Sequence, residues 1–230
     1  AKNITSDAID LTLGAFLETG YGDYDTKNDG TKGEGKAKYY GGGFLGRLST
    51  IDDIGPYVEV SGRIGHSENE WSSKAADQAK FDDMKGLYYG AHVALGVEGK
   101  LENNWAYDVY GKFLWTHQNG DETEINGAQF KFKDTESFKT RLGVKFTQET
   151  PEGFSPYIGV AWVYEFACKV KATVNGVAIE EPKLSGDTGV VDLGFDYTPE
   201  ENANWSFGLK ATGYFGQRSG AAGQILFKSK

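Results

Sequence analysis

Long runs of alternating apolar and polar residues are the feature that most restricts how this sequence can fold. In residues 105–116, Trp105, Val109 and Phe113 fall on one side of the alternation. Asp108 and Lys112 fall on the other side. Successive side chains of a β-strand point to opposite faces, so the pattern predicts a strand with one apolar face. Its length of about twelve residues exceeds the roughly 5–6 of an ordinary strand and approaches the roughly 9–11 that cross a bilayer.

The same alternation recurs along the whole chain. Apolar residues make up 39% of the sequence and aromatic residues 14%, with 32 Gly and 5 Pro, which favours many strands and tight turns. No apolar run approaches the roughly 18 residues of a spanning helix. These features predict an all-β fold, an antiparallel transmembrane β-barrel with about ten strands in this chain. The candidate strands cover residues 11–24, 36–49, 55–68, 86–99, 104–118, 136–148, 154–170, 187–198, 204–216 and 222–229.

The predicted connections alternate in length. Outer-membrane barrels have short periplasmic turns and longer external loops, so this alternation supports a membrane barrel and places its two rims. The short connections lie at residues 49–54, 100–103, 149–153 and 199–203, and the long polar stretches at 25–35, 67–85, 119–135 and 169–186.

The first ten residues are expected to be the remainder of another short periplasmic turn, which follows an earlier strand. Bacterial single-chain barrels have even strand numbers, so we expect twelve strands when complete, with the N-terminal strands and the linker outside this sequence. The chain opens without a basic segment followed by an apolar one, so we expect an internal or mature piece. Residues 1–230 are then one outer-membrane barrel domain.

Charged residues gather on one face of the predicted strands, which we assign to the lumen. On the lipid face each charge would cost on the order of 2–4 kcal/mol near the membrane midplane. The assigned face holds seven acids and seven bases although the chain carries a net charge of −9. These charges either line a passage or hold a plug, or they fill a narrow interior as ordinary ion pairs. The lumen-lining candidates are Glu18, Arg47, Glu59, Arg63, Glu98, Asp108, Lys112, Lys139, Arg141, Lys145, Glu165, Asp192, Asp196 and Lys210.

Aromatic residues cluster toward both ends of the predicted strands. Two such bands match the girdles that flank the apolar belt of membrane barrels, although aromatic residues also favour strands in general. The membrane-interface candidates are Tyr57, Trp105, Tyr157 and Trp205 after short turns, with Trp115 and Tyr164 toward the other rim.

The sequence offers no catalytic, cofactor or metal site. His66, His92 and His117 are the only histidines, and each lies on or at the end of a different predicted strand without a Ser or Cys nucleophile in a catalytic spacing. Cys168 is the only cysteine, which excludes an internal disulfide. The net negative charge disfavours nucleic acid as a partner, because phosphates need a basic surface. We therefore expect a protein that is not an enzyme.

Several segments resemble the β-domain of bacterial autotransporters, the translocator barrel of type V secretion in Gram-negative bacteria. They keep their order over nearly the whole chain. The segments are Leu11 to Glu18 with Tyr24 to Thr26, Tyr39-Tyr-Gly-Gly-Gly-Phe-Leu-Gly-Arg47, Tyr88-Tyr-Gly-Ala-His-Val-Ala-Leu-Gly96, Asp108 to Thr116, Ser155 to Ala161 with Tyr164 to Phe166, and Gly186 to Gly189.

The resemblance implies a twelve-stranded barrel in the bacterial outer membrane that anchors an N-terminal passenger and mediates its export to the cell surface. It also implies three partners: outer-membrane lipid, a covalently linked passenger and the barrel-assembly machinery. Two other functions stay open on the residues alone. A diffusion porin would have the same barrel without a passenger, and a soluble ligand-binding barrel would have an apolar interior and a charged exterior.

Overall fold

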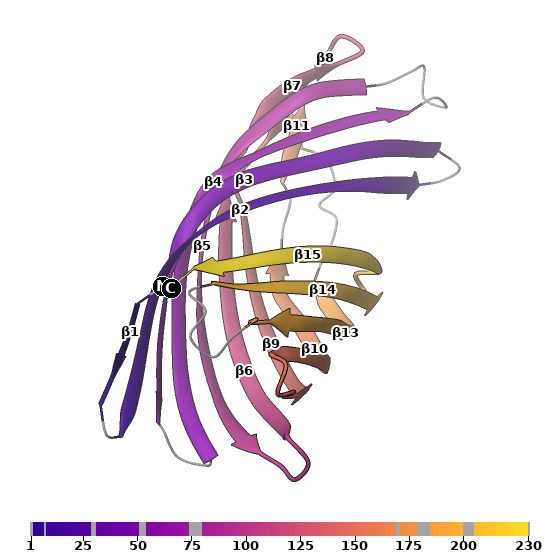
Figure 1. The fold of residues 1–230 in the computed structure, drawn as a ribbon. Helices are drawn as coiled ribbons and strands as arrows, with labels where there is room; N and C mark the ends of the chain where they lie inside the picture. The colour runs from indigo at the N-terminus through magenta and orange to yellow at the C-terminus, as the bar shows by residue number, and fades with distance from the viewer. Residues whose placement is uncertain are drawn as a thin grey trace.

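The computed structural model describes residues 2–6, 8–28, 31–50, 54–73, 80–168, 171–178, 185–199 and 205–229. Eleven antiparallel strands form one strongly curled sheet, in which each strand pairs with the next along the sheet (Figure 1). Among the described residues no helix is long and apolar enough to cross a membrane. The strands are β1 (Lys2–Thr5), β2 (Ile9–Asn28), β3 (Thr31–Thr50), β4 (Ile54–Ser73), β5 (Lys80–Lys100), β6 (Trp105–Gln118), β9 (Thr135–Gln148), β10 (Phe154–Cys168), β13 (Gly186–Tyr197), β14 (Trp205–Gly216) and β15 (Gly220–Ser229).

All ten predicted strands are confirmed, but the first ten residues are not only a turn. Lys2–Thr5 form β1, which pairs with β2 from Lys2 opposite Leu13 to Thr5 opposite Asp10. The four residues are too few for a period-two pattern to be visible in the sequence. At the other side of the sheet β15 pairs with β14, and no pairing joins β15 to β1 or β2 within the described part of the chain.

The long polar stretches are also more ordered than predicted. β2 to β5 run for 20 or 21 residues each, so strand pairing continues into residues that we expected to be loops. β7 (Glu122–Ile125), β8 (Ala128–Phe132), β11 (Ala172–Val174) and β12 (Val177–Ala178) form a second sheet in the order β12-β11-β8-β7. Both turns in this small sheet are Asn-Gly pairs with positive φ, at Asn126-Gly127 and Asn175-Gly176, as tight hairpins require.

The outer face of β3 changes character along its length. Tyr40, Phe44 and Leu48 are exposed apolar residues, whereas Lys36 and Lys38 continue the same face with charge. The change occurs at one level on three neighbouring strands, because Lys38 is the register partner of Glu68, and Glu68 that of Lys85. We call residues 31–38, 67–73 and 80–86 the strand extension.

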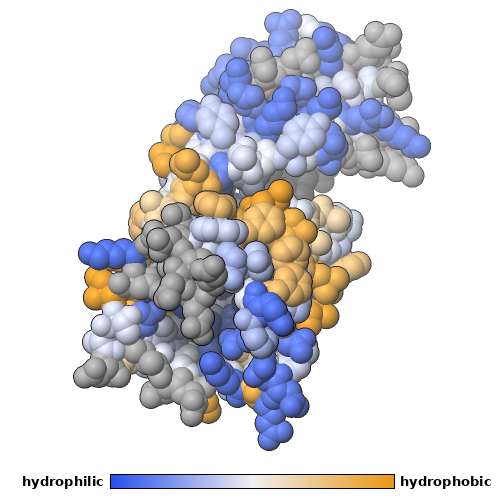
Figure 2. Space-filling model, viewed as in Figure 1, coloured by the Kyte–Doolittle hydropathy of each residue, from blue (hydrophilic) through white to orange (hydrophobic). Residues whose placement is uncertain are grey.

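The apolar residues below the strand extension form a continuous surface. In Figure 2 a hydrophobic band crosses the middle of the molecule, and the upper end, where the strand extension and the small sheet lie, is mostly hydrophilic. Exposed residues of the band include Leu17, Ile64, Leu95, Val109 and Leu193. Apolar side chains in such number outside a sheet are stable only against a nonpolar surrounding such as lipid.

Candidate functional site

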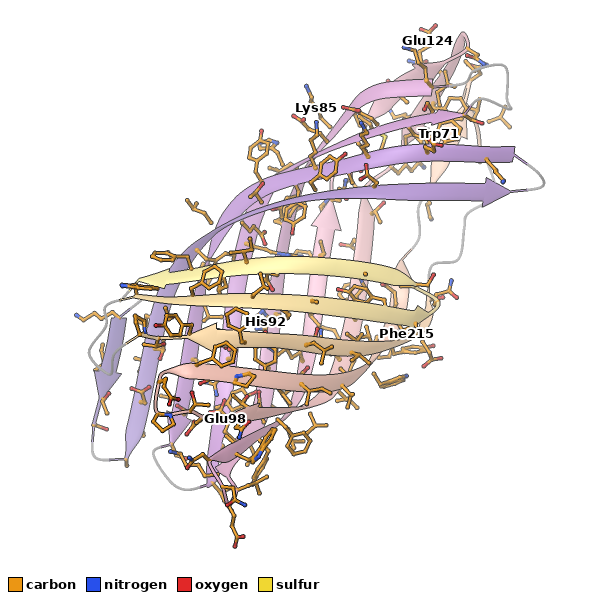
Figure 3. All side chains as sticks on the ribbon, turned by 45° about the vertical axis from the view of Figure 1, so that its right-hand side comes forward. Trp71, Lys85, His92, Glu98, Glu124 and Phe215 are labelled. Carbon is orange, nitrogen blue, oxygen red and sulfur yellow. The ribbon has the colours of Figure 1, made fainter. Side chains whose placement is uncertain are left out.

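The surface opposite the apolar band carries the charges, and we call it the inner face. Strand register assigns side chains to it, since partners across a ladder share a face: Glu98 is opposite Asp108, and Asp108 is opposite Lys145. All fourteen predicted lumen residues lie on this face by that criterion. In Figure 3 His92 and Glu98 lie within the hollow of the curled sheet, and Lys85 and Glu124 lie beyond it.

Glu59 on β4 is the centre of the first charge cluster. Its Oε1 atom lies 2.9 Å from His92 Nε2 and 3.2 Å from Lys112 Nζ, and its Oε2 lies 3.8 Å from an Arg47 nitrogen. Arg47 also pairs with Glu98. The cluster joins four consecutive strands, β3 to β6. Its ion pairs therefore link strands that are not neighbours as well as strands that are.

Glu18 on β2 is the centre of the second cluster. Arg63 on β4 approaches Glu18 Oε2 to 3.5 Å, and the Tyr88 hydroxyl donates to Glu18 Oε1 at 2.9 Å. Neither partner is on the neighbouring strand β3, where Gly41 is the register partner of Glu18. A side chain at Gly41 would overlap the Tyr88 hydroxyl, so the glycine leaves room for this contact over β3.

Asp192 on β13 is the centre of the third cluster. Arg141 donates to Asp192 Oδ2, and the Thr212 hydroxyl donates to its Oδ1 at 2.6 Å. The Nε atom of Arg141 also donates to the Tyr110 hydroxyl at 3.1 Å. These contacts join β6, β9, β13 and β14, just as the first cluster joins β3 to β6.

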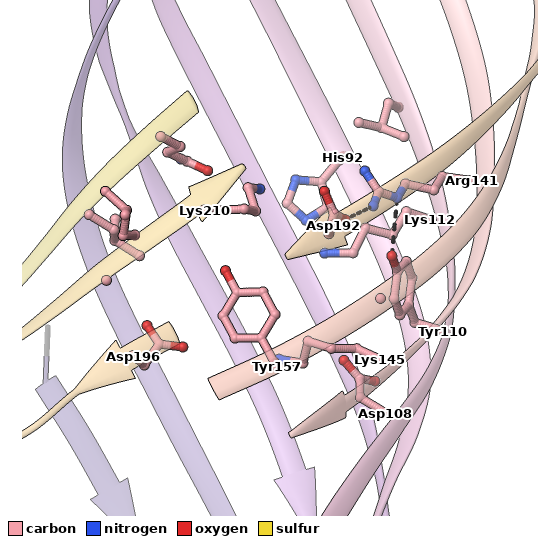
Figure 4. A pocket seen from close by; sticks show the side chains of 16 residues that line it. His92, Asp108, Tyr110, Lys112, Arg141, Lys145, Tyr157, Asp192, Asp196 and Lys210 are labelled. Carbon is pink, nitrogen blue, oxygen red and sulfur yellow. Dashed lines mark hydrogen bonds and ion pairs between the residues drawn. The ribbon is translucent and has the colours of Figure 1, made fainter. Parts of the chain in front are cut away.

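The inner face also encloses a cavity of about 400 Å³ (Figure 4). Lys145, Asp196 and Lys210 line it together with residues of the first and third clusters. Within the described residues no carboxylate lies within 4.0 Å of Lys145 or Lys210. Lys145 instead lies 5.4 Å from the centre of the Tyr157 ring. The cavity wall therefore combines leucine side chains with charged groups that are directed into the open space.

Comparison with known proteins decides what this barrel is. A family model described as the autotransporter beta-domain matches residues 7–210. The chain belongs to the autotransporter β-domain family. The barrel is accordingly a translocator that serves an N-terminal passenger domain at the outer membrane.

Two solved structures share the fold of this β-domain. The transport unit of the autotransporter AIDA-I from Escherichia coli matches with a TM-score of 0.51 and 13% identity, over 97% of this chain and 84% of that one. The beta domain of the Bordetella autotransporter BrkA matches with a TM-score of 0.57 and 15% identity, over 98% of this chain and 91% of that one. Comparison with curated proteins gave no match.

Two of the aromatic residues predicted at the membrane interface lie on the inner face of the β-domain instead. Tyr57 is only 4% exposed, and its hydroxyl donates to Asp108 at 2.9 Å on the inner face. Tyr157 lines the cavity. The prediction that these two tyrosines lie at the membrane interface is therefore wrong. The sequence could have shown this for Tyr57, because it is two residues before Glu59 and side chains two apart on a strand share a face. The other four candidates, Trp105, Trp115, Tyr164 and Trp205, lie on the outer face by register.

The β-domain also contradicts the expectation that no nucleophile stands beside a histidine. Ser61 on β4 is the register partner of His92 on β5, and Ser61 Oγ lies 2.5 Å from His92 Nδ1. The residues are far apart along the chain, so spacing gave no signal. Of the other histidines, His117 lies 3.6 Å from Glu136 and 3.7 Å from Asp134. Within the described residues no three His, Cys, Asp or Glu side chains are placed to hold a metal ion.

Proposed function

We propose that the inner face of this β-domain is the surface that the exported polypeptide contacts as it passes to the cell surface. The observation that carries the proposal is the balance of positive and negative charges on this face. Five bases and five acids are already paired with one another: Arg47, Arg63, Lys112, Lys139 and Arg141 with Glu18, Glu59, Glu98, Glu165 and Asp192.

A self-neutralised polar wall suits a passing chain of varied sequence. It offers hydrogen bonds and water along the route, and it lacks the strong net charge that would hold one class of segment in place. The wall also argues against a soluble ligand-binding barrel, whose interior would be apolar. We propose further that residues 1–230 act as one translocator domain, that Trp105, Trp115, Tyr164 and Trp205 contact the membrane interfaces, and that the barrel-assembly machinery inserts the domain.

Site-specific photo-crosslinking tests the route directly. A photoreactive residue in place of Lys210 would face the cavity. The same residue in place of the adjacent Ala211 would face outward, because Ala211 is exposed and is the register partner of the outer residue Leu193. During export we expect the Lys210 position to crosslink to the passenger and the Ala211 position to crosslink to lipid or to assembly factors. Equal crosslinking of the passenger from both positions would contradict the proposal.

Fractionation and gel migration test the location. We expect the protein in the outer-membrane fraction, extracted only by detergent, with a faster band before boiling than after it. A freely soluble protein without that shift would contradict a membrane barrel. A barrel in the outer membrane that carries no passenger would instead indicate a pore.

A further inference from the structure

Ser61 contacts the Glu59 cluster but takes part in none of its ion pairs. Ser61 Oγ lies 2.5 Å from His92 Nδ1, and His92 Nε2 lies 2.9 Å from Glu59 Oε1. Nucleophile, base and orienting carboxylate thus follow one another in hydrogen-bonding contact, which is the arrangement that activates a serine. We propose that Ser61, His92 and Glu59 form a nucleophilic site that accepts the acyl group of a carboxylic ester.

Strand geometry holds the three side chains together. Ser61 and His92 face each other directly across the β4–β5 ladder, and Glu59 precedes Ser61 by two residues on the same face. The side chains of His92 and Glu59 are 18% and 13% exposed, so both are mostly enclosed by their neighbours. The imidazole is therefore fixed between its two partners.

The hydrogen bonds select one tautomer of the imidazole. The Glu59 carboxylate accepts, so the ring proton of neutral His92 lies on Nε2. This leaves the Nδ1 lone pair to accept the Ser61 hydroxyl proton. The roles of the two ring nitrogens follow from the strand register and do not depend on a bound ligand.

A cation lies beside the site, next to Glu59. Lys112 Nζ lies 3.2 Å from Glu59 Oε1, and Lys112 and His92 both line the cavity (Figure 4). Backbone N–H groups within paired strands are used in the ladder, so a side-chain ammonium is the donor available to a developing oxyanion. An ester that enters the cavity would meet this cation and His92, whose Nδ1 atom lies 2.5 Å from Ser61 Oγ.

The chemical step is an acyl transfer. The Ser61 oxygen attacks the ester carbonyl carbon while its proton moves to His92 Nδ1, and Lys112 stabilises the resulting oxyanion. The carbon–oxygen bond to the alcohol then breaks, and His92 returns the proton to the departing oxygen. Water hydrolyses the acyl-serine by the same sequence, which releases the carboxylic acid and restores Ser61. The step needs no exported chain, so it goes beyond translocation.

Labelling with a fluorophosphonate probe, followed by mapping of the adduct by mass spectrometry, tests the site in the detergent-purified protein. We expect an adduct on Ser61, no adduct there in Ser61→Ala, and labelling at least about tenfold slower in His92→Gln. Ser67→Ala is the matched control, because Ser67 lies on the same face of β4 and contacts Gly86 and Gln118 rather than a histidine. Absence of an adduct on Ser61 in the wild-type protein would overturn the proposal, as would labelling that His92→Gln leaves unchanged.

A thiol series gives an independent test. In a Cys168→Ser background we expect Ser61→Cys to react with iodoacetamide about tenfold faster than Ser67→Cys, since a neighbouring base raises the thiolate fraction. Equal rates would overturn the proposal. Gel migration before and after boiling establishes that each variant is folded, and export of the passenger is followed separately. If the wild-type protein exports its passenger but is not labelled on Ser61, the serine site is overturned and the proposed translocation route is unaffected.

Discussion

The ring of Tyr57 occupies the space that a side chain at its register partner Gly96 would fill. The ring cannot easily move away, because the Arg47 guanidinium carbon lies 3.8 Å from the ring centre and the hydroxyl is bonded to Asp108. Tyr157 occupies the same kind of space over Gly194. These glycines leave room for the large tyrosine rings to lie over the neighbouring strand on the inner face.

Replacement of Gly96 by Ala should destabilise the barrel by about 1–3 kcal/mol, because the new methyl group overlaps a ring held on two sides. Urea unfolding of the protein in detergent, followed by gel migration, measures the change. Gly22→Ala is the control, since no atom lies within 4 Å of the position its Cβ would take. Equal midpoints for the two variants would show that the Tyr57 ring is free to move.

Arg141 and Asp192 should be energetically coupled. Their side chains are 23% and 12% exposed, so Arg141→Met leaves a partly buried carboxylate without its cation and should cost about 1–3 kcal/mol. Arg141→Met with Asp192→Asn should cost less than the sum of the single variants in the same unfolding measurement. Additive effects would contradict the coupling.

The pair of Lys100 and Glu149 provides the contrast to Arg141 and Asp192. Its atoms are 3.7 Å apart, but the side chains are 74% and 52% exposed, so solvent screens the attraction. Lys100→Met should change the free energy of unfolding by no more than about 0.5 kcal/mol. A larger loss would indicate that the short turns depend on this contact.

A lysine on β15 should be tolerated on one face and not on the other. Ile225 is 72% exposed on the outer face, whereas its neighbour Leu226 lines the cavity. Ile225→Lys should cost on the order of 2–4 kcal/mol in the membrane and reduce the amount of assembled barrel, while Leu226→Lys should assemble nearly as well as the wild type. Outer-membrane yield and gel migration before boiling report both. The opposite ranking would reverse our assignment of the two faces.

Single-tryptophan variants should locate the membrane boundaries. Trp105 begins β6 and Trp115 lies near its end, so both should be quenched more by lipids brominated near the headgroup than by lipids brominated near the bilayer centre. Trp71 lies on the strand extension and should be quenched weakly by either lipid. Strongest quenching of Trp105 or Trp115 from the bilayer centre would contradict their place at the interfaces.

The sequence by itself determined the strands and their two faces. Every second residue of a strand shares a face, so parity alone brought Glu59, Arg63 and the other twelve lumen candidates to one surface. The same rule placed Tyr57 there, although its position after a short turn suggested a girdle residue. Local backbone geometry produces this signal, and it therefore needs no knowledge of neighbouring strands.

Only the tertiary structure decided which side chains meet. Ser61 and His92 are 31 residues apart, and only the β4–β5 register brings them together. The strand extension escaped prediction because charged residues such as Lys38 and Glu68 continue its outer face and end the apolar alternation. The small sheet escaped prediction because its strands have only 2 to 5 residues, too few for a pattern to stand out. Alternation records the surroundings of each face, whereas pairing depends on hydrogen bonds between distant segments, and those are fixed only when the whole sheet forms.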